Sequence, residues 1–315
     1  MPMPKGQFRG TGMASEAARG ITAMVVACTV WGLSPLYYKL LEHIPPIEIL
    51  AHRTLWSALF FTLVLAGQGR LPQLRAALGS WRSRLIVGFA ALMISLNWFV
   101  FILSIQIGRV TEASLGYYLF PLVAVALGRV FFSERLTRAQ GVAVALAVLA
   151  VLVLTFGLGV APWIALILSG SFGLYGVIKK RLDVGPVVSV TGEVMMLAPI
   201  AAAVLILAHA TPGGGAYGRD LGDSVLLMVS GVMTGAPLIL FSYATKRVRL
   251  GTIGLVQYLN PTLQFLVAVA IFGEAFGQWH AIAFVLIWIA LALYTLATWR
   301  QDRAARRAAL SVGTS

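Results

Sequence analysis

Ionisable side chains lie within the long apolar stretches of this sequence, among them Glu48, His52, Arg53 and Glu193. An ionisable group inside a membrane costs about 2.5–3.5 kcal/mol on insertion scales and usually faces a cavity or a partner. An arginine at the position of Arg53 is typical of a residue that binds a solute anion or acts in a gate. His52 titrates near neutral pH and fits a proton-linked group. Glu193 is the best candidate for a proton-coupling carboxylate, because burial makes a carboxyl group easier to protonate near neutral pH.

Arg53 and Glu193 also have a structural interpretation. Arg53 can bond backbone carbonyls and pair with Glu48 or Glu112, and Glu193 can pair with a lysine at 179–180. Arg53 and Glu193 lie about 10 Å from opposite edges of an apolar core about 30 Å thick. A direct pair between them is therefore disfavoured, and we expect two separate polar networks.

Two prolines mark a second candidate region. Pro121 and Pro261 fall near the middle of their apolar stretches, where proline removes a helix hydrogen bond and displaces the carbonyl four residues earlier. Two helices broken at matching depths are typical of a solute site in a membrane carrier, although plain packing of kinked helices remains the alternative. Aromatic and amide side chains at this depth suit an amphipathic or aromatic molecule. These candidates are Trp31, Asn97, Trp98, Tyr117, Tyr118, Gln257, Tyr258 and Asn260.

Composition places these residues in a lipid environment. Of the 315 residues 59% are hydrophobic and 11% are charged, whereas soluble proteins average about 25% charged. This excludes a soluble enzyme, a disordered protein and a nucleic-acid partner, despite the net charge of +13. A single cysteine, scattered histidines and no nucleotide-binding lysine motif predict no metal and no cofactor. Residues 213–218 match the Gly-x-Gly-x-x-Gly pattern of dinucleotide-binding sites, but no predicted strand precedes them. We therefore interpret this match as chance.

The apolar stretches predict an all-α membrane protein with ten transmembrane helices, since a helix needs about 20 apolar residues to span a bilayer. The expected spans are 21–41, 46–66, 85–107, 111–132, 139–157, 161–178, 187–209, 224–245, 250–272 and 279–299. The side that holds both termini carries 19 of the 24 Lys and Arg residues and the other side three. Positive charge is enriched in cytoplasmic loops, which predicts that both termini are cytoplasmic.

The chain repeats itself after 140 residues. Tyr118, Pro121 and Glu134 fall on Tyr258, Pro261 and Glu274 without a gap, and Trp31-Gly32-Leu33 falls near Phe172-Gly173-Leu174. We therefore divide the chain into a cytoplasmic N-terminal segment (1–20), two five-helix repeats (21–158 and 159–299) and a cytoplasmic basic tail (300–315). Because five is odd, the second repeat is inverted, and inverted repeats provide two related conformations that open to opposite sides.

Several motifs together resemble one family of membrane proteins. They are the run 31–39, the stretch Glu48-Ile-Leu-Ala-His-Arg53, Asn97-Trp98, the run 112–117 and Gln257-Tyr258. This pattern is similar to the EamA family of the drug/metabolite transporter superfamily. The resemblance implies a bacterial inner-membrane permease with two EamA repeats. One departure is Phe120, which stands before Pro121 where such proteins usually carry Asn; here the Asn appears in the other half, as Asn260.

The sequence therefore predicts a secondary transporter that moves a small organic metabolite or drug-like solute by alternating access. Export in exchange for protons is the first hypothesis, with the lipid bilayer and the solute as partners; a homodimer is left open. One alternative is a membrane-embedded enzyme acting on lipid, which would need a nucleophile–base pair or a metal cluster at one membrane face. The other is a non-transporting scaffold, which would leave Arg53 and Glu193 free to change.

Overall fold

The computed structural model describes residues 9–133, 136–179, 182, 184–248 and 250–312, and it is almost entirely helical over these ranges. The helices of the first half are α1 (Arg9–Lys39), α2 (Pro46–Gly67), α3 (Leu71–Ala77), α4 (Trp81–Gln106), α5 (Val110–Phe132) and α6 (Arg138–Leu158). Those of the second half are α7 (Trp163–Lys179), α8 (Pro186–Ala210), α9 (Leu221–Thr245), α10 (Leu250–Gln257), α11 (Leu259–Leu266), a π-helical turn η1 (Val267–Ile271) and α12 (Gln278–Val312).

The ten spans expected from hydropathy are confirmed. Within the described ranges nine helices, counting 252–271 as one, are long and apolar enough to cross a membrane, and the shorter apolar helix α7 is the tenth. Local signals set several ends: Pro46 occupies the first turn of α2, and Thr137 with Gln140 forms a capping box at the start of α6. The short helix α3 was not expected; it lies within the longer 67–84 connection.

The two matched prolines have different effects. The ninth span is divided at Tyr258, between α10 and α11, three residues before Pro261. The expected break at Pro121 is wrong, because α5 runs from Val110 to Phe132 with the proline inside it. A proline disturbs the turn that precedes it, but the surrounding packing decides whether the helix bends or divides.

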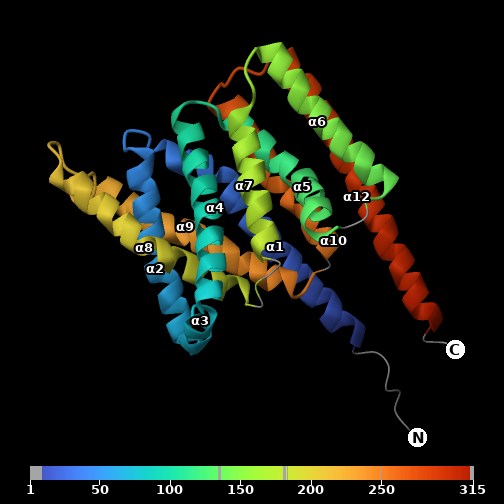
Figure 1. Cartoon of the computed structure of the whole chain (residues 1–315), viewed down its shortest axis with the longest axis horizontal. Helices are drawn as coiled ribbons and strands as arrows, with labels where there is room; N and C mark the ends of the chain where they lie inside the picture. The colour runs from blue at the N-terminus through green and yellow to red at the C-terminus, as the bar shows by residue number, and fades with distance from the viewer. Residues whose placement is uncertain (1–8, 134–135, 180–181, 183, 249, 313–315) are drawn as a thin grey trace, which may run out of the picture.

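The two halves interleave, and their contacts follow a pseudo-two-fold pattern. The second helices of the halves, α2 and α8, pack together, and so do the last helices, α6 and α12, which Figure 1 shows side by side at one edge. The first helix of each half packs on the other half: α1 contacts α9 and α11, and α7 contacts α4 and α5. Exchanging the halves reproduces this set of pairs, as expected for a repeat related by a two-fold axis.

Two glycines from the repeated tripeptide show the same symmetry at atomic scale. A Cβ atom added to Gly32 of α1 would lie 2.7 Å from the Leu263 Cβ in α11. A Cβ atom added to Gly173 of α7 would lie 2.8 Å from Leu127 and 3.1 Å from Val123 in α5. Val123 and Leu263 are themselves 140 residues apart. Each glycine therefore lets the first helix of one half approach the proline-containing span of the other half closely.

The outward faces of the helices are apolar. Large hydrophobic side chains remain exposed along the bundle, among them Leu63 (62%), Phe156 (81%) and Ile206 (69%). A water-soluble protein does not expose apolar surface on this scale, so the helices require a lipid environment. In Figure 1 the beginning of α1 and the end of α12 lie on the same side of the bundle, which agrees with an even number of crossings.

Candidate functional site

Arg53 is buried in the half of α2 that lies near the α1–α2 connection. Its side chain is 7% exposed, and its Nε donates a hydrogen bond of 2.8 Å to the Thr234 Oγ1 in α9. The guanidinium carbon lies 4.3 Å from the ring centroid of Trp98 and 5.6 Å from that of Tyr38. A cation within about 6 Å of an aromatic face is attracted by the ring. The guanidinium is therefore held between a hydroxyl group and two aromatic walls.

The carboxylates that the sequence suggested as partners of Arg53 lie elsewhere. Glu48 accepts a hydrogen bond of 2.6 Å from the backbone N–H of Ala216. Glu112 forms an ion pair with Arg109 and accepts a hydrogen bond of 2.8 Å from the backbone N–H of Ile164. Over the part of the chain that the structure describes, no Asp or Glu forms an ion pair with Arg53.

A second polar centre lies at the start of α8. The Glu193 side chain is fully buried and forms an ion pair with Lys179 at the end of α7. The Tyr175 hydroxyl donates to one Glu193 oxygen at 3.0 Å, and the Ser189 hydroxyl donates to the other at 2.9 Å. Lys179 also lies 4.9 Å from the ring centroid of Tyr175. The carboxylate is thus fully partnered, as a buried charge must be to offset its loss of hydration.

A continuous row of aromatic rings joins the two centres. The ring of Tyr38, which faces Arg53, is 6.1 Å from Phe101, and Phe101 is 5.9 Å from Tyr117. Tyr117 is 6.4 Å from Phe172, and Phe172 is stacked at 5.9 Å on Tyr175, which bonds Glu193. These rings come from α1, α4, α5 and α7, so the row runs through the region where the two halves interleave.

Asn97 fixes the middle of this row. Its side-chain amide donates to the Leu168 carbonyl at 2.9 Å and to Ser171 at 3.2 Å, and its oxygen accepts from the Tyr117 hydroxyl at 3.1 Å. Asn97 is 2% exposed. Because three helices meet at one buried amide, its contacts tie α4 to α5 and α7.

The other predicted residues lie in different places. Tyr118 and Tyr258, which are matched by the 140-residue repeat, stack on each other at 6.4 Å, and Tyr118 also bonds Thr262 at 2.6 Å. This cluster lies between α5, α11 and α12. Asn260 accepts a hydrogen bond from Gln264 at 2.9 Å within α11.

Two further candidates, Trp31 and Gln257, also lie outside the Arg53 environment. Trp31 packs 6.3 Å from Phe241 of α9, and Gln257 ends α10. The candidates therefore divide into two groups. Trp98 contacts Arg53, and Asn97 and Tyr117 belong to the aromatic row that starts at Tyr38. The others lie elsewhere, namely Trp31, Tyr118, Gln257, Tyr258 and Asn260.

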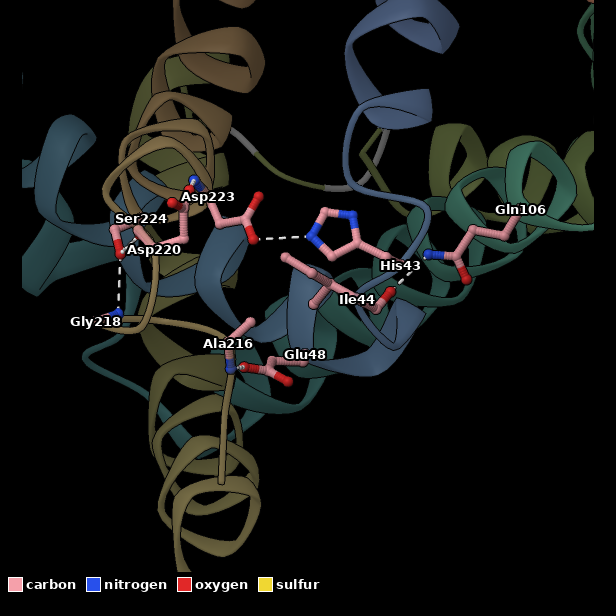
Figure 2. Close-up of polar contacts among 9 residues, drawn as sticks. All are labelled: His43, Ile44, Glu48, Gln106, Ala216, Gly218, Asp220, Asp223 and Ser224. Carbon is pink, nitrogen blue, oxygen red and sulfur yellow. Dashed lines mark hydrogen bonds and ion pairs between the residues drawn. The ribbon is translucent and has the colours of Figure 1, made fainter. Parts of the chain in front are cut away.

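The loop formed by residues 211–220, between α8 and α9, makes contacts that the sequence did not predict. The α8–α9 connection packs on α2: Ala216 bonds Glu48, and the Tyr217 ring stacks 5.1 Å from His52 (Figure 2 shows the Glu48 contact). Glu48 and His52 are one helical turn apart on α2, so the loop covers one face of that helix. Figure 2 also shows His43 bonded to Asp223 at 2.8 Å, which joins the α1–α2 connection to the start of α9.

Glycine makes this loop conformation available. Gly213, Gly214 and Gly218 have φ values of +103°, +61° and +87°, which other residues rarely adopt. A Cβ atom on Gly215 would lie 2.9 Å from the Glu48 Oε1 and 2.4 Å from the His209 Cε1. The glycines at 213–218 are therefore required by the conformation of this loop, a structural role that the sequence did not predict. A glycine-rich connection between two long apolar spans was the available signal.

The opposite end of the bundle holds a cleft. A cavity of about 1180 Å³ lies between α3, α4, α7 and α8, with Phe131 of α5 at its wall. Ile178 and Val188 line it, and their chain neighbours Lys179 and Ser189 belong to the Glu193 centre. A folded loop thus covers one face of α2 at one end of the helix bundle, and a cleft lies next to a buried ion pair at the other end.

Metal ions in proteins are held by groups of His, Cys, Asp and Glu side chains. Within the described ranges, no three His, Cys, Asp or Glu side chains are grouped so that they could hold a metal ion. The geometry instead defines a multi-pass helical membrane protein with two similar interleaved halves and buried polar centres.

Comparison with known proteins identifies the family. A model described as the EamA-like transporter family matches residues 18–156 and again residues 161–296. The chain belongs to the EamA-like transporter family and carries two copies of its domain, which confirms the resemblance seen in the sequence. This is a transporter family rather than an enzyme family.

The relatives agree with this assignment over nearly their whole length. The uncharacterized transporter YojE of Bacillus subtilis is 39% identical over 93% of this chain and 98% of its own. Protein RarD of Streptomyces exfoliatus is 40% identical, with 93% and 92% covered, and protein RarD of Escherichia coli is 35% identical, with 90% and 96% covered. A solved crystal structure matches 90% of this chain and 98% of its own with a TM-score of 0.59 at 22% identity, which supports the fold.

Proposed function

We propose that this protein is a secondary transporter that moves a small organic solute across the bacterial inner membrane by alternating access between its two five-helix halves. The observation that carries the proposal is the position of its two buried polar centres. Arg53 and Glu193 are 140 residues apart, so the repeat places them at matched positions of α2 and α8. These two helices pack together at the pseudo-two-fold axis.

Matched positions across a pseudo-two-fold axis matter because the two halves can exchange conformations. A movement that opens the bundle at the Arg53 end has a counterpart that opens it at the Glu193 end. The arrangement described above is asymmetric: loop 211–220 covers α2 at one end, and a cleft lies beside α8 at the other. It corresponds to one of the two states, closed at the Arg53 end.

The charge distribution supports an orientation. The cleft end carries both chain termini and most of the Lys and Arg residues, and we propose that this end is cytoplasmic. Loop 211–220 then closes the external end. The division at 158–159 separates the repeats that would move against each other.

We further propose that protons drive export through Glu193. The Glu193 carboxylate is paired with Lys179. When water enters the cleft, a proton can replace Lys179 as the partner of this carboxylate, which would couple the movement of the halves to a proton gradient. The Tyr175 and Ser189 hydroxyls would keep the protonated group hydrogen-bonded. Export in exchange for protons fits the bacterial inner membrane, across which the proton gradient drives protons inward.

Transport by purified protein in proteoliposomes tests this function. Vesicles loaded with a mixture of small organic acids, amines and neutral aromatic compounds are followed by mass spectrometry of the released solutes, with and without a pH gradient. Arg53→Ala and Glu193→Gln are expected to abolish release of the solute that the parent protein moves. The matched controls Arg129→Ala, an exposed arginine of α5, and Glu42→Gln, in an exposed ion pair, are expected to leave it intact.

Two outcomes would contradict the proposal. If no solute crosses the vesicle membrane in either direction, the chain is not a transporter, and a non-transporting scaffold becomes the better account. If Arg53→Ala and Glu193→Gln both transport as well as the controls, the polar centres are structural and the assigned site is wrong. A pH-gradient dependence that is unchanged in Glu193→Gln would remove Glu193 from the coupling step.

A further inference from the structure

The guanidinium of Arg53 has unused hydrogen-bonding capacity. Arginine has five N–H donors, and only the Nε donor has a partner among the residues that the structure describes, the hydroxyl of Thr234. The two Nη groups therefore offer a planar fork. This fork matches the two oxygens of a carboxylate, which it binds through two parallel hydrogen bonds.

Among the described residues, no Asp or Glu side chain pairs with this fork. Glu48 and Glu112 are the acidic residues suggested by sequence, and both are engaged by backbone N–H groups of other segments. A buried cation without a counter-charge is costly, because electrostatic interactions are strong and hydration is lost in a low-dielectric interior. A bound anion would offset this cost, so the site favours a ligand that brings a negative charge.

The surroundings of Arg53 favour a flat apolar body on the same ligand. Trp98 and Tyr38 face the guanidinium at 4.3 Å and 5.6 Å, and Phe101 continues the wall from Tyr38 at 6.1 Å. Aromatic walls pack best against planar groups by offset stacking or edge contacts. A ligand whose carboxylate meets the Nη fork would lay its body along this row.

Over the described ranges, no carboxylate contacts Arg53, and the two suggested partners, Glu48 and Glu112, are hydrogen-bonded to other segments. The Glu193 carboxylate, at the other end of the aromatic row, is occupied by Lys179, Tyr175 and Ser189. An ammonium group placed beside the guanidinium would therefore be repelled by a like charge, with no carboxylate among the described contacts of Arg53 to offset the repulsion. This argues against an amine or a zwitterion and for a ligand with net negative charge.

We propose that Arg53, Trp98 and Tyr38 form the recognition site for a solute that carries one carboxylate on a flat aromatic body. This inference rests on the transport function proposed above and specifies the class of its solute. Loop 211–220 would close over the bound anion from the external side, since Tyr217 stacks on His52, the residue that precedes Arg53 in α2.

Matched pairs of probes test the inference. The ligands are phenylacetate, indole-3-acetate and benzoate, each compared with its neutral amide, together with tryptamine, chloride and inorganic phosphate. Binding to the detergent-solubilised full-length protein is measured by isothermal titration and by competition in proteoliposome counterflow. The variants are Arg53→Ala, Arg53→Lys, which keeps the charge but loses the fork, and the control Arg129→Ala.

The expected result is that aromatic carboxylates bind and exchange whereas their amides and tryptamine bind at least about 30-fold more weakly, as for loss of a buried charge pair. Arg53→Ala is expected to remove this preference, Arg53→Lys to weaken carboxylate binding about tenfold, and Arg129→Ala to change neither.

Several results would overturn the inference. They are equal binding of acids and amides, binding of chloride or phosphate only, or an acid preference that survives Arg53→Ala. Transport of neutral or cationic solutes with no carboxylate bound would overturn it while leaving the proposed transport function intact. Absence of any transport would instead remove the function itself.

Discussion

Replacing Lys179 with Met is expected to destabilise the protein more than replacing Glu193 with Gln, although the two residues form one ion pair. Glu193 is fully buried, whereas the Lys179 side chain is 22% exposed beside the cleft. Without the lysine, the carboxylate keeps only the Tyr175 and Ser189 hydroxyls as partners. Without the glutamate, the flexible lysine can turn its ammonium group towards water.

The magnitudes follow from this difference in exposure. Removing one member of a buried ion pair costs about 3–5 kcal/mol, which we expect for Lys179→Met. Because Lys179 can regain water, we expect Glu193→Gln to cost about 1–2 kcal/mol, the scale of lost buried hydrogen bonds. Replacing both residues removes both charges, and the double variant should cost less than about 1.5 kcal/mol. At about 2 °C per kcal/mol, Lys179→Met lowers the unfolding temperature by about 6–10 °C.

The chain contains its own reporter for this assay. Cys28 is the single cysteine and is buried, so a thiol-reactive fluorophore signals unfolding when the helices separate. Lys39→Met provides the control, since Lys39 pairs with Glu42 on the surface and an exposed pair is worth about 0–1 kcal/mol. Equal shifts for Lys179→Met and Glu193→Gln, or simple addition of the two in the double variant, would refute the reasoning.

Three further predictions concern Arg53 and the glycines. Arg53→Met should leave the unfolding temperature unchanged or raise it, because no counter-charge is stranded; a fall as large as that of Lys179→Met would show a structural partner. Gly215→Ala should prevent loop 211–220 from seating on Glu48 and should speed maleimide labelling of His52→Cys, whereas Gly67→Ala, with open space around it, should not. Gly32→Ala and Gly173→Ala should each cost about 1–3 kcal/mol through overpacking, and a loss confined to one of them would contradict the symmetric contacts.

Hydropathy was sufficient to predict the spans, because crossing a bilayer imposes both length and apolar character on each helix. It also predicted that Arg53 and Glu193 are buried, since ionisable residues within apolar runs are conspicuous in the sequence. The interleaving of the halves was not predictable in this way. Gly32 and Gly173 were matched as a repeat, but nothing local indicated that each would approach the opposite half.

Partners distant along the chain were the main failure of prediction. Glu48 is bonded by a backbone N–H 168 residues away, and a backbone donor has no signature in the sequence. Neighbouring Tyr117 and Tyr118 were grouped together, but a helix turns about 100° per residue and sends them to different clusters. Pro121 and Pro261 look equivalent in sequence, yet only the second lies beside a break, because the surrounding helices decide how a proline is accommodated.

Alternating access at Arg53 is the central claim, and one accessibility measurement tests it most directly. In a Cys28→Ala background, a cysteine replaces Thr234, which contacts Arg53. A membrane-impermeant maleimide is then applied to right-side-out and to inside-out vesicles, with and without an aromatic carboxylate. We expect labelling from both faces in separate experiments, with the ligand shifting the ratio between them. Labelling from one face only under every condition, or from neither, would contradict alternating access at this site.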